Sequence, residues 1–289
     1  MEPLMHGPIM RYCGGKWRIA EWVISHFPKA DQYDTYIEPF GGAGSVLMQK
    51  APSQFEVYND LDSEIVNVFR VLRDPLQADR LMDLLMLTPY AREEFELTYR
   101  EVVSDPVEQA RRTLFRAASG FGSASATKGR TGFRGYSGSS GRGVNPARYW
   151  SRYPPEIAKF CERLKTVVIE NRPAVQLMRD RDGPRVLHYA DPPYVLDSRV
   201  MQTGDRYYRH EMTDDDHADL ISTCAQLEGF VILSGYQTDV YRDLLSDWKM
   251  VSVHALASGN RGSVKRTECL WLSPRVASQQ YQNDMFNTA

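Results

Sequence analysis

Short apolar runs alternate with helical segments along much of this chain, and that alternation constrains the fold more than any other feature. Helical spacing of apolar residues marks residues 16–27, a segment opening near Gly44, residues 63–73, residues 173–181, a segment after the N-cap candidate Thr213, and residues 238–247. The expected strands are "TYIE" ending at Glu38, "FEVYND" ending at Asp60, "TVVIEN", "RVLHYA", "GFVILSGY", "KMVSVHA" and "TECLWLS". Strands that are joined through helices pair in parallel. The sequence therefore predicts an α/β fold built on a parallel sheet.

The middle of the chain breaks this alternation. Residues 75–118 have the spacing of successive helices with no strand between them, and a stretch rich in glycine, serine and arginine follows. We therefore expect residues 74–153 to form an insertion into a domain made of residues 1–73 and 154–275. The last residues, 276–289, are rich in Gln and Asn and are predicted to form a flexible tail.

Composition excludes several classes of protein. The 289 residues carry a net charge of −2, which is not that of a generally basic nucleic-acid binder. Cys13, Cys161, Cys224 and Cys269 form no C-x-x-C pair and have no histidine cluster nearby, which argues against zinc and against a disulfide framework. A signal peptide and an uncharged apolar run of membrane-spanning length are both missing. We expect a cytoplasmic protein.

A glycine-rich stretch, "EPFGGAGSV", follows the first expected strand. Glycines in this context let a backbone approach a bound cofactor closely. Asp60 lies 22 residues after Glu38, near the spacing of roughly 20 at which an acid bonds a ribose hydroxyl in dinucleotide-binding folds. Glu38 and Pro39 stand where the first glycine of G-x-G-x-x-G would be, so an adenosine-containing ligand without a phosphate chain fits better. Alternatively, the glycines only permit a tight turn and Asp60 caps the next helix.

A tetrapeptide, Asp191-Pro192-Pro193-Tyr194, follows the apolar run "RVLHYA". It is expected at the carboxyl edge of the sheet, where ligands bind in open α/β folds. The two prolines hold the backbone nearly rigid. Asp191 and the Pro192 carbonyl would supply two fixed acceptors, and Tyr194 a flat aromatic face, which together suit an exocyclic amino group on a heteroaromatic base. The alternative is an edge turn with an N-cap acid.

Together these segments resemble the DNA adenine-N6 methyltransferases, in the subgroup whose cofactor segments precede the target-recognition insertion and whose D-P-P-Y follows it. The resemblance runs from "RYCGGKW" to "TECLWLSP". It implies a Rossmann-like S-adenosylmethionine-dependent methyltransferase fold, a mostly helical DNA-recognition insertion, S-adenosylhomocysteine as a product, and no metal. The implied catalytic residues are Asp191, Pro192, Pro193 and Tyr194. The implied cofactor-binding residues are Tyr12, Gly14, Gly15, Lys16, Glu38, Pro39, Phe40, Gly42, Gly44, Asp60 and Asp191.

The implied reaction needs the target adenine outside the double helix. Asp191 and the Pro192 carbonyl would accept the two N6 hydrogens and aim the nitrogen lone pair at the methyl group, while Tyr194 stacks on the flipped base. Cytosine-N4 methylation uses the same amino-group chemistry, but enzymes of that kind more often carry Ser where this chain has Asp191. A non-catalytic DNA-binding module on the same fold is the remaining alternative.

Residues 109–155 carry nine basic side chains and no acid, which predicts a surface for double-stranded DNA. A solvated disordered loop is the alternative. Phe133 and Tyr136 would wedge into the stack left by the flipped base, and "RYYRHE" at 206–211 would cover the site. The expected DNA-binding residues are Arg116, Lys128, Arg130, Phe133, Arg134, Tyr136, Arg142 and Arg148, with Arg261 and Lys265 in a loop before the last strand.

The tail contains one further motif. "QNDMF", from Gln282 to Phe286, resembles the peptide by which bacterial replication proteins bind the sliding clamp. Such a short pattern is often accidental. With the family resemblance, it suggests a bacterial or phage-encoded enzyme, of the kind also found in restriction-modification systems.

Overall fold

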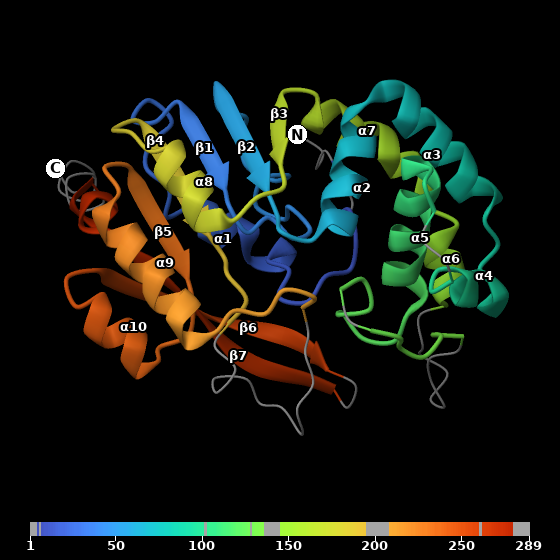
Figure 1. The fold of residues 1–289 in the computed structure, drawn as a ribbon. Helices are drawn as coiled ribbons and strands as arrows, with labels where there is room; N and C mark the ends of the chain where they lie inside the picture. The colour runs from blue at the N-terminus through green and yellow to red at the C-terminus, as the bar shows by residue number, and fades with distance from the viewer. Residues whose placement is uncertain are drawn as a thin grey trace, which may run out of the picture.

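The computed structural model describes residues 5, 7–100, 103–127, 129–135, 145–194, 208–259 and 262–279. These residues form a seven-stranded sheet in the order β3-β2-β1-β4-β5-β7-β6 (Figure 1). Five strands are parallel: β1 (Thr35–Glu38), β2 (Phe55–Asn59), β3 (Val167–Glu170), β4 (Val186–Ala190) and β5 (Phe230–Ser234). The predicted α/β class is confirmed.

One edge of the sheet is antiparallel, in addition to the parallel strands that the alternation predicts. β6 (Lys249–Gly259) and β7 (Gly262–Leu272) pair antiparallel, and β7 also runs antiparallel to β5. No helix separates these two strands, so they form a hairpin with Gly259 opposite Gly262. Lys265 therefore lies within β7 rather than in a loop, while Arg261 lies outside the described residues.

The order of the strands determines where a ligand can bind. β1 has β2 on one side and β4 on the other, so the chain reverses its direction of progress across the sheet between β1 and β4. Ligands of open α/β folds bind at the carboxyl ends of the strands at such a switch point. Every residue of β4 and β5 is buried, which explains why both strands are continuous apolar runs in the sequence.

Helices cover both faces of the sheet and lie between the strands in sequence (Figure 1). The segment predicted over 16–27 forms η1 (Trp17–Ile19) and α1 (Ala20–Ile24), and the others are α2 (Ser63–Arg73), α8 (Ala174–Asp180), α9 (Asp214–Gln226) and α10 (Asp239–Leu244). Thr213 and Asp216 form a capping box at α9, as the sequence predicted for Thr213. The helix predicted near Gly44 is not formed, because residues 45–49 make turns only.

The insertion is mostly helical. It contains α3 (Pro75–Leu87), α4 (Arg92–Leu97), α5 (Pro106–Ser119) and α6 (Pro146–Trp150), and η2 (Pro154–Glu156) and α7 (Ile157–Leu164) lead back to the sheet. Asp74, Asp105 and Asn145 cap α3, α5 and α6, each followed by a proline at the first helical position. Figure 1 shows these helices grouped on one side, next to α2.

The insertion has no separate core. Phe69 and Leu72 of α2, Leu114 and Phe115 of α5, and Phe160 of α7 belong to one cluster of buried hydrophobic side chains. The sheet and the insertion therefore pack against each other directly.

The C-terminal end differs from the prediction. Residues 274–279 are helical, and Val276 is only 1% exposed, so the flexible tail does not begin at residue 276. Gln282–Phe286 lie outside the described residues. Within the described part of the chain, no helix is long and apolar enough to span a membrane.

Candidate active site

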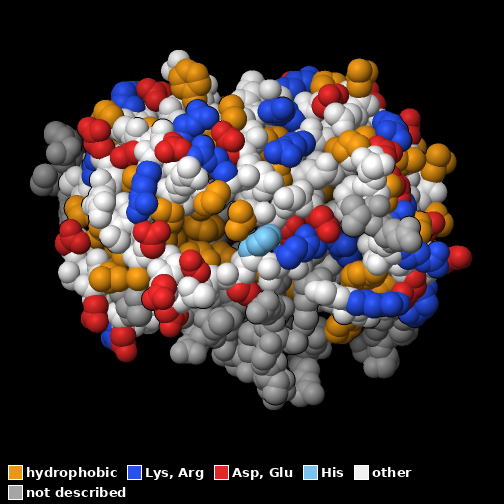
Figure 2. All heavy atoms as spheres, in the orientation of Figure 1, with side chains coloured by type: hydrophobic (Ala, Val, Ile, Leu, Met, Phe, Trp, Pro, Cys, Tyr) orange, Lys and Arg blue, Asp and Glu red, His pale blue; other side chains and the backbone are white. Residues whose placement is uncertain are grey.

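A cavity of about 310 Å³ opens at the switch point, at the carboxyl ends of β1, β2 and β4. In Figure 2 this face is hollowed near its centre, with hydrophobic side chains beside a histidine and a mixed cluster of acidic and basic side chains. The lining comes from residues 12–16, 38–43, 45–46, 59–62, 172–175, 189, 191–194, 208–212, 216 and 219, and from Thr127 of the insertion. All the residues assigned above to cofactor binding and catalysis line this cavity except Gly44.

The glycine-rich turn is held by Asp60. One carboxylate oxygen accepts the N–H of Gly42 at 2.8 Å, and the other accepts the N–H of Asp62 at 2.8 Å. Gly42 has a φ of 50°, and a Cβ there would lie 2.7 Å from the ring of Tyr12. Gly44 also has a positive φ and faces Phe69 instead of the cavity. Burial raises the pKa of Asp60 to about 6. Asp60 therefore shapes the turn whatever else it binds.

Asp62 is a site residue that the sequence analysis missed. Its Oδ1 accepts the N–H of Glu64 and so caps α2. Its Oδ2 is buried and has no hydrogen-bond partner among the described residues. The pattern of an acid before a helical run could have identified the cap, but not an oxygen left over for a ligand in the cavity wall.

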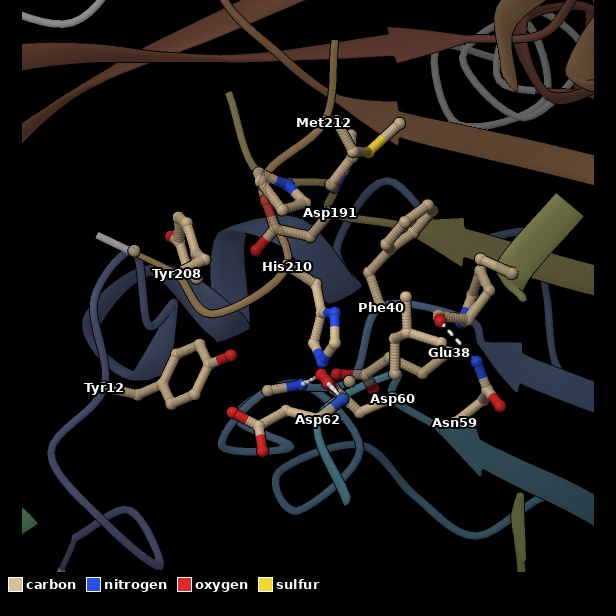
Figure 3. A pocket seen from close by; sticks show the side chains of 18 of the residues that line it. Tyr12, Glu38, Phe40, Asn59, Asp60, Asp62, Asp191, Tyr208, His210 and Met212 are labelled. Atoms are coloured by element: carbon tan, nitrogen blue, oxygen red, sulfur yellow. Dashed lines mark hydrogen bonds between the residues drawn. The ribbon is translucent and has the colours of Figure 1, made fainter. Parts of the chain in front are cut away.

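Aromatic side chains line the same cavity. Figure 3 shows Tyr12 and Tyr208 on one side, Phe40 on the other, and His210 between Asp191 and the pair Asp60 and Asp62. The rings of Tyr12 and Tyr208 are 6.0 Å apart, and the Tyr208 hydroxyl donates to the carbonyl of Cys13 at 3.1 Å. The described part of the segment expected to cover the site, residues 208–211, thus forms part of the cavity wall.

Lys16 joins the N-terminal segment to the D-P-P-Y segment. Its Nζ lies 2.9 Å from Asp191 Oδ1, 2.8 Å from the Tyr194 hydroxyl and 3.6 Å from Glu268 Oε2. The Tyr194 hydroxyl in turn donates to Glu268 at 2.8 Å. Burial works to lower the pKa of Lys16, but the carboxylates of Asp191 and Glu268 outweigh it and raise that pKa.

Of the two acids near Lys16, the sequence predicted Asp191 as a site residue but not Glu268. Burial raises the pKa of Asp191 and Lys16 counteracts this rise, so Lys16 favours the carboxylate form. Glu268, in β7, was missed, because nothing in "TECLWLS" indicates that its glutamate lies beside a tetrapeptide more than 70 residues earlier.

Glu38 holds the chain directly after the glycine-rich turn, through a hydrogen bond with Leu47. Its Oε2 accepts from the Tyr36 hydroxyl at 2.8 Å and from the Leu47 N–H at 3.0 Å. Burial raises the pKa of Glu38 to about 8, so the side chain is mostly protonated at neutral pH.

Two residues expected to contact DNA need correction. Arg116 is only 5% exposed and forms an ion pair with Glu64 inside the protein, so it is not available to a phosphate. Phe133 packs between Tyr90 and Phe95, at ring distances of 5.4 and 5.6 Å, and is not a free wedge. Among the described residues of this region, Phe121 and Tyr149 are exposed aromatic side chains, at 53% and 49%.

The other expected DNA contacts fall into two groups. Arg130 and Arg148 are exposed and Arg134 is half-buried, and Arg130 forms an ion pair with Glu96. Outside the described residues lie Lys128, Tyr136, Arg142 and Arg261, and only the backbone of Lys265 is described.

The fold and the cavity define a class of protein. Five parallel strands extended by an antiparallel hairpin, with a ligand cavity at the switch point that includes D-P-P-Y, make this a Rossmann-like methyltransferase. Residues 12–258 match the D12 class N6 adenine-specific DNA methyltransferase family, and the chain belongs to that family.

Two relatives agree with this assignment. The chain is 24% identical to the type II methyltransferase M1.LlaDCHI of Lactococcus lactis subsp. cremoris over 273 residues, which cover 90% of this chain and 91% of the relative. It is 33% identical over 72 residues to a DNA adenine methylase of Haemophilus influenzae, a match that covers 24% of this chain and 23% of the relative. The enzyme is therefore an adenine-specific DNA methyltransferase, and neither cytosine-N4 methylation nor a non-catalytic module describes it.

Proposed function

We propose that this enzyme transfers a methyl group from S-adenosylmethionine to N6 of an adenine that has been flipped out of double-stranded DNA at a specific site. One observation carries the proposal: Asp191 and Tyr194 line the same cavity as the glycine-rich turn, Asp60 and Asp62. A base amino group and a methyl donor can therefore meet in one enclosed space.

The cavity fits an adenosine-containing cofactor. Asp62 Oδ2 is a buried acceptor without a partner among the described residues, which a ribose hydroxyl would satisfy. Gly42 has no room for a Cβ, so the turn brings its backbone close to whatever fills the space. Tyr12 and Phe40 supply apolar walls for a purine (Figure 3). When bound, S-adenosylmethionine supplies an electrophilic methyl group.

Asp191 and the Pro192 carbonyl would hold the adenine amino group. Lys16 favours the ionised form of Asp191, which is the form that accepts a hydrogen bond. Accepting both hydrogens would turn the nitrogen lone pair towards the methyl group, and such orientation contributes several kcal/mol, up to roughly 7–11 in the best cases. The carboxylate also stabilises the positive charge that develops on nitrogen.

Tyr194 would stack on the flipped adenine. Its hydroxyl is fixed by Lys16 and Glu268, so the direction of its ring is set before the base arrives. Stacking contributes about 1–3 kcal/mol per base. That recovers much of the few kcal/mol that unstacking and unpairing cost.

Double-stranded DNA would contact the basic surface of the insertion. We include Arg130, Arg134 and Arg148, and from outside the described residues Lys128, Tyr136, Arg142 and Arg261, together with Lys265 of the hairpin. Phosphate contacts of this kind make affinity fall steeply with salt. Phe121 and Tyr149, rather than Phe133, are exposed aromatic side chains that could enter the base stack.

A contact with the sliding clamp through Gln282–Phe286 is a separate hypothesis, on residues outside the described part of the chain. Deleting residues 280–289 should abolish clamp binding, and unchanged binding of the shortened chain would exclude the contact.

The Asp191→Asn variant tests the proposed chemistry. We expect methyl transfer from tritiated S-adenosylmethionine to unmethylated genomic DNA to fall by roughly 10²–10³ or more, because the amide oxygen can still accept a hydrogen bond but the negative charge that stabilises the reacting nitrogen is lost. Affinity for duplex DNA in a gel-shift assay should be unchanged. Arg181→Gln, which alters an exposed ion pair with Glu170, is the surface control. Full activity in Asp191→Asn, or modified cytosine when the products are mapped at base resolution, would refute the proposal.

A further inference from the structure

Arg116 lies at a junction between the insertion and the cofactor cavity. It belongs to α5, its side chain is 6% exposed, and it forms an ion pair with Glu64 of α2. Its guanidinium also donates to the carbonyl of Ala126 at 3.2 Å and to that of Thr98 at 3.4 Å. One buried cation thus contacts three segments of the chain.

The first of these contacts leads to the wall of the cavity formed by residues 208–212. Glu64, the partner of Arg116, also lies 3.2 Å from the guanidinium of Arg209. Arg209 contacts Asp62 as well, at 2.5 Å. Tyr208 and His210, on either side of Arg209, both line the cavity. This wall is therefore joined to Glu64 through Arg209, and the Glu64 carboxylate forms an ion pair with Arg116.

The second contact, with Ala126, leads to the part of the cavity wall that the insertion supplies. Ala126, whose carbonyl accepts from Arg116, precedes Thr127, the insertion residue that lines the cavity. Thr127 is 3% exposed. Arg116 thus supports two walls of the cavity, although it is not part of the lining.

We propose that Arg116 is a positioning residue for cofactor binding, which acts through Glu64 on Arg209 and through Ala126 on Thr127. The inference rests on the proposed function, in that the cavity binds S-adenosylmethionine. It links the insertion that meets DNA to the cofactor cavity through a named chain of contacts, Arg116–Glu64–Arg209.

The chemistry of arginine explains the choice of residue. A guanidinium presents five N–H donors in a planar fork, so it can bond a carboxylate and two carbonyls at once. A lysine ammonium at the same place keeps the charge but is a compact donor group that cannot span these acceptors. Arg116→Lys should therefore keep the charge and lose the positioning.

A binding measurement tests the chain of contacts. Affinity for S-adenosylhomocysteine is measured by titration calorimetry on the full-length protein for Arg116→Lys, Glu64→Gln, Arg209→Gln and the double variant Glu64→Gln/Arg209→Gln. We expect each single variant to bind about 5–10-fold more weakly, and the double variant to bind no more weakly than Arg209→Gln alone, because coupled residues are not additive. In methylation assays, KM for the cofactor should rise while kcat at saturation changes less than about twofold.

Arg80→Gln is the matched control. Arg80 is also an arginine of the insertion and pairs with Asp105 at 2.5 Å, but 57% of its side chain is exposed. This variant should bind S-adenosylhomocysteine as the wild type does.

The outcomes are distinguishable. Wild-type affinity in Glu64→Gln and Arg209→Gln, or losses that add fully in the double variant, would overturn the proposal even if Arg116→Lys fails to fold. Failure of the wild-type protein to bind S-adenosylhomocysteine would instead refute the proposed function.

Discussion

Three charged side chains, Lys16, Asp191 and Glu268, lie together in the candidate active site. Lys16 lies between Asp191 and Glu268, so two acids face one cation in a buried place. If Asp191 were the only partner, the ammonium would neutralise the acceptor that we propose for the adenine amino group. Glu268 takes part of the charge of Lys16 and leaves the group of three with a net negative charge, which favours a positively charged sulfonium nearby.

Glu268→Gln tests this distribution of charge. The amide oxygen can still accept from the Tyr194 hydroxyl, so the variant removes charge and keeps the hydrogen bond. We expect kcat to fall about 10–100-fold. Affinity for the cationic S-adenosylmethionine should fall about 3–10-fold more than affinity for the neutral S-adenosylhomocysteine, since only the first carries the sulfonium charge.

Calorimetry with both ligands measures this difference. Glu162→Gln, in which an exposed glutamate of α7 is changed, is the control. Equal losses for the two ligands would mean that Glu268 has a packing role only.

The glycine-rich turn is the element on which the cofactor side of the cavity depends. Gly42→Ala would place a methyl group 2.7 Å from the ring of Tyr12, at a φ that side chains disfavour. The ring must then move out of the cavity wall. We expect at least a tenfold loss of S-adenosylhomocysteine affinity, measured by calorimetry.

Gly122→Ala separates backbone strain from contact. Gly122 also has a positive φ, of 88°, but a Cβ there meets nothing within 4 Å. It should lose stability without losing cofactor affinity. Similar affinity losses in both variants would show that strain, not displacement of Tyr12, is responsible.

Elements encoded by local signals were predicted from the sequence. The helix over residues 63–73 has the bounds expected, because its apolar period lies within the segment itself, although its cap is Asp62 and not Asp60. The strands up to Asp60 and Asp191 end within one residue of expectation, and every residue assigned to the cavity except Gly44 lines it. The spacing of apolar residues, the helix caps and the residues that end a helix or strand are all properties of neighbours in the sequence.

Features that depend on distant partners were not predicted. Arg116 resembles a DNA contact in a run without acids, and its partner Glu64 is 52 residues away. Three other features likewise follow from packing between remote segments: the antiparallel direction of β6 and β7, the Asp62 oxygen that has no partner among the described residues, and the position of Glu268. The segment expected to be helical from Gly44 makes turns at residues 45–49, in which the N–H groups of Met48 and Lys50 bond the carbonyls of Gly44 and Val46.

At the scale of the whole molecule, an ion-pair network joins the segments of the chain that come before and after the insertion. The chain leaves the sheet after α2 and returns through α7, where Arg163 meets Glu56 of β2 with two contacts, at 2.6 and 2.9 Å. Lys50 contacts the same carboxylate at 2.5 Å. Arg163 also donates to the carbonyl of Leu47 at 2.8 Å, the residue whose N–H bonds Glu38 behind the glycine-rich turn.

Glu56→Gln should destabilise the fold in a pH-dependent way. Burial works to raise the pKa of Glu56, but Arg163 and Lys50 outweigh it and lower that pKa. A lowered folded-state pKa means that the stabilisation is present above the unfolded value near 4.3 and is lost as pH falls through the folded value. At pH 7 the variant leaves two buried cations without their carboxylate, which costs about 3–5 kcal/mol of unfolding free energy.

Urea unfolding between pH 3 and pH 7 measures this effect. The difference between wild type and Glu56→Gln should be largest at pH 7 and shrink below about pH 4, because protonation removes the same charge from the wild type. Glu162→Gln breaks an exposed pair with Lys165 and should change stability by less than about 0.5 kcal/mol. If the unfolding free energy of Glu56→Gln differed from that of the wild type by the same amount at every pH, the network would not hold the two halves of the domain together. The turn behind the cofactor cavity would then need another support.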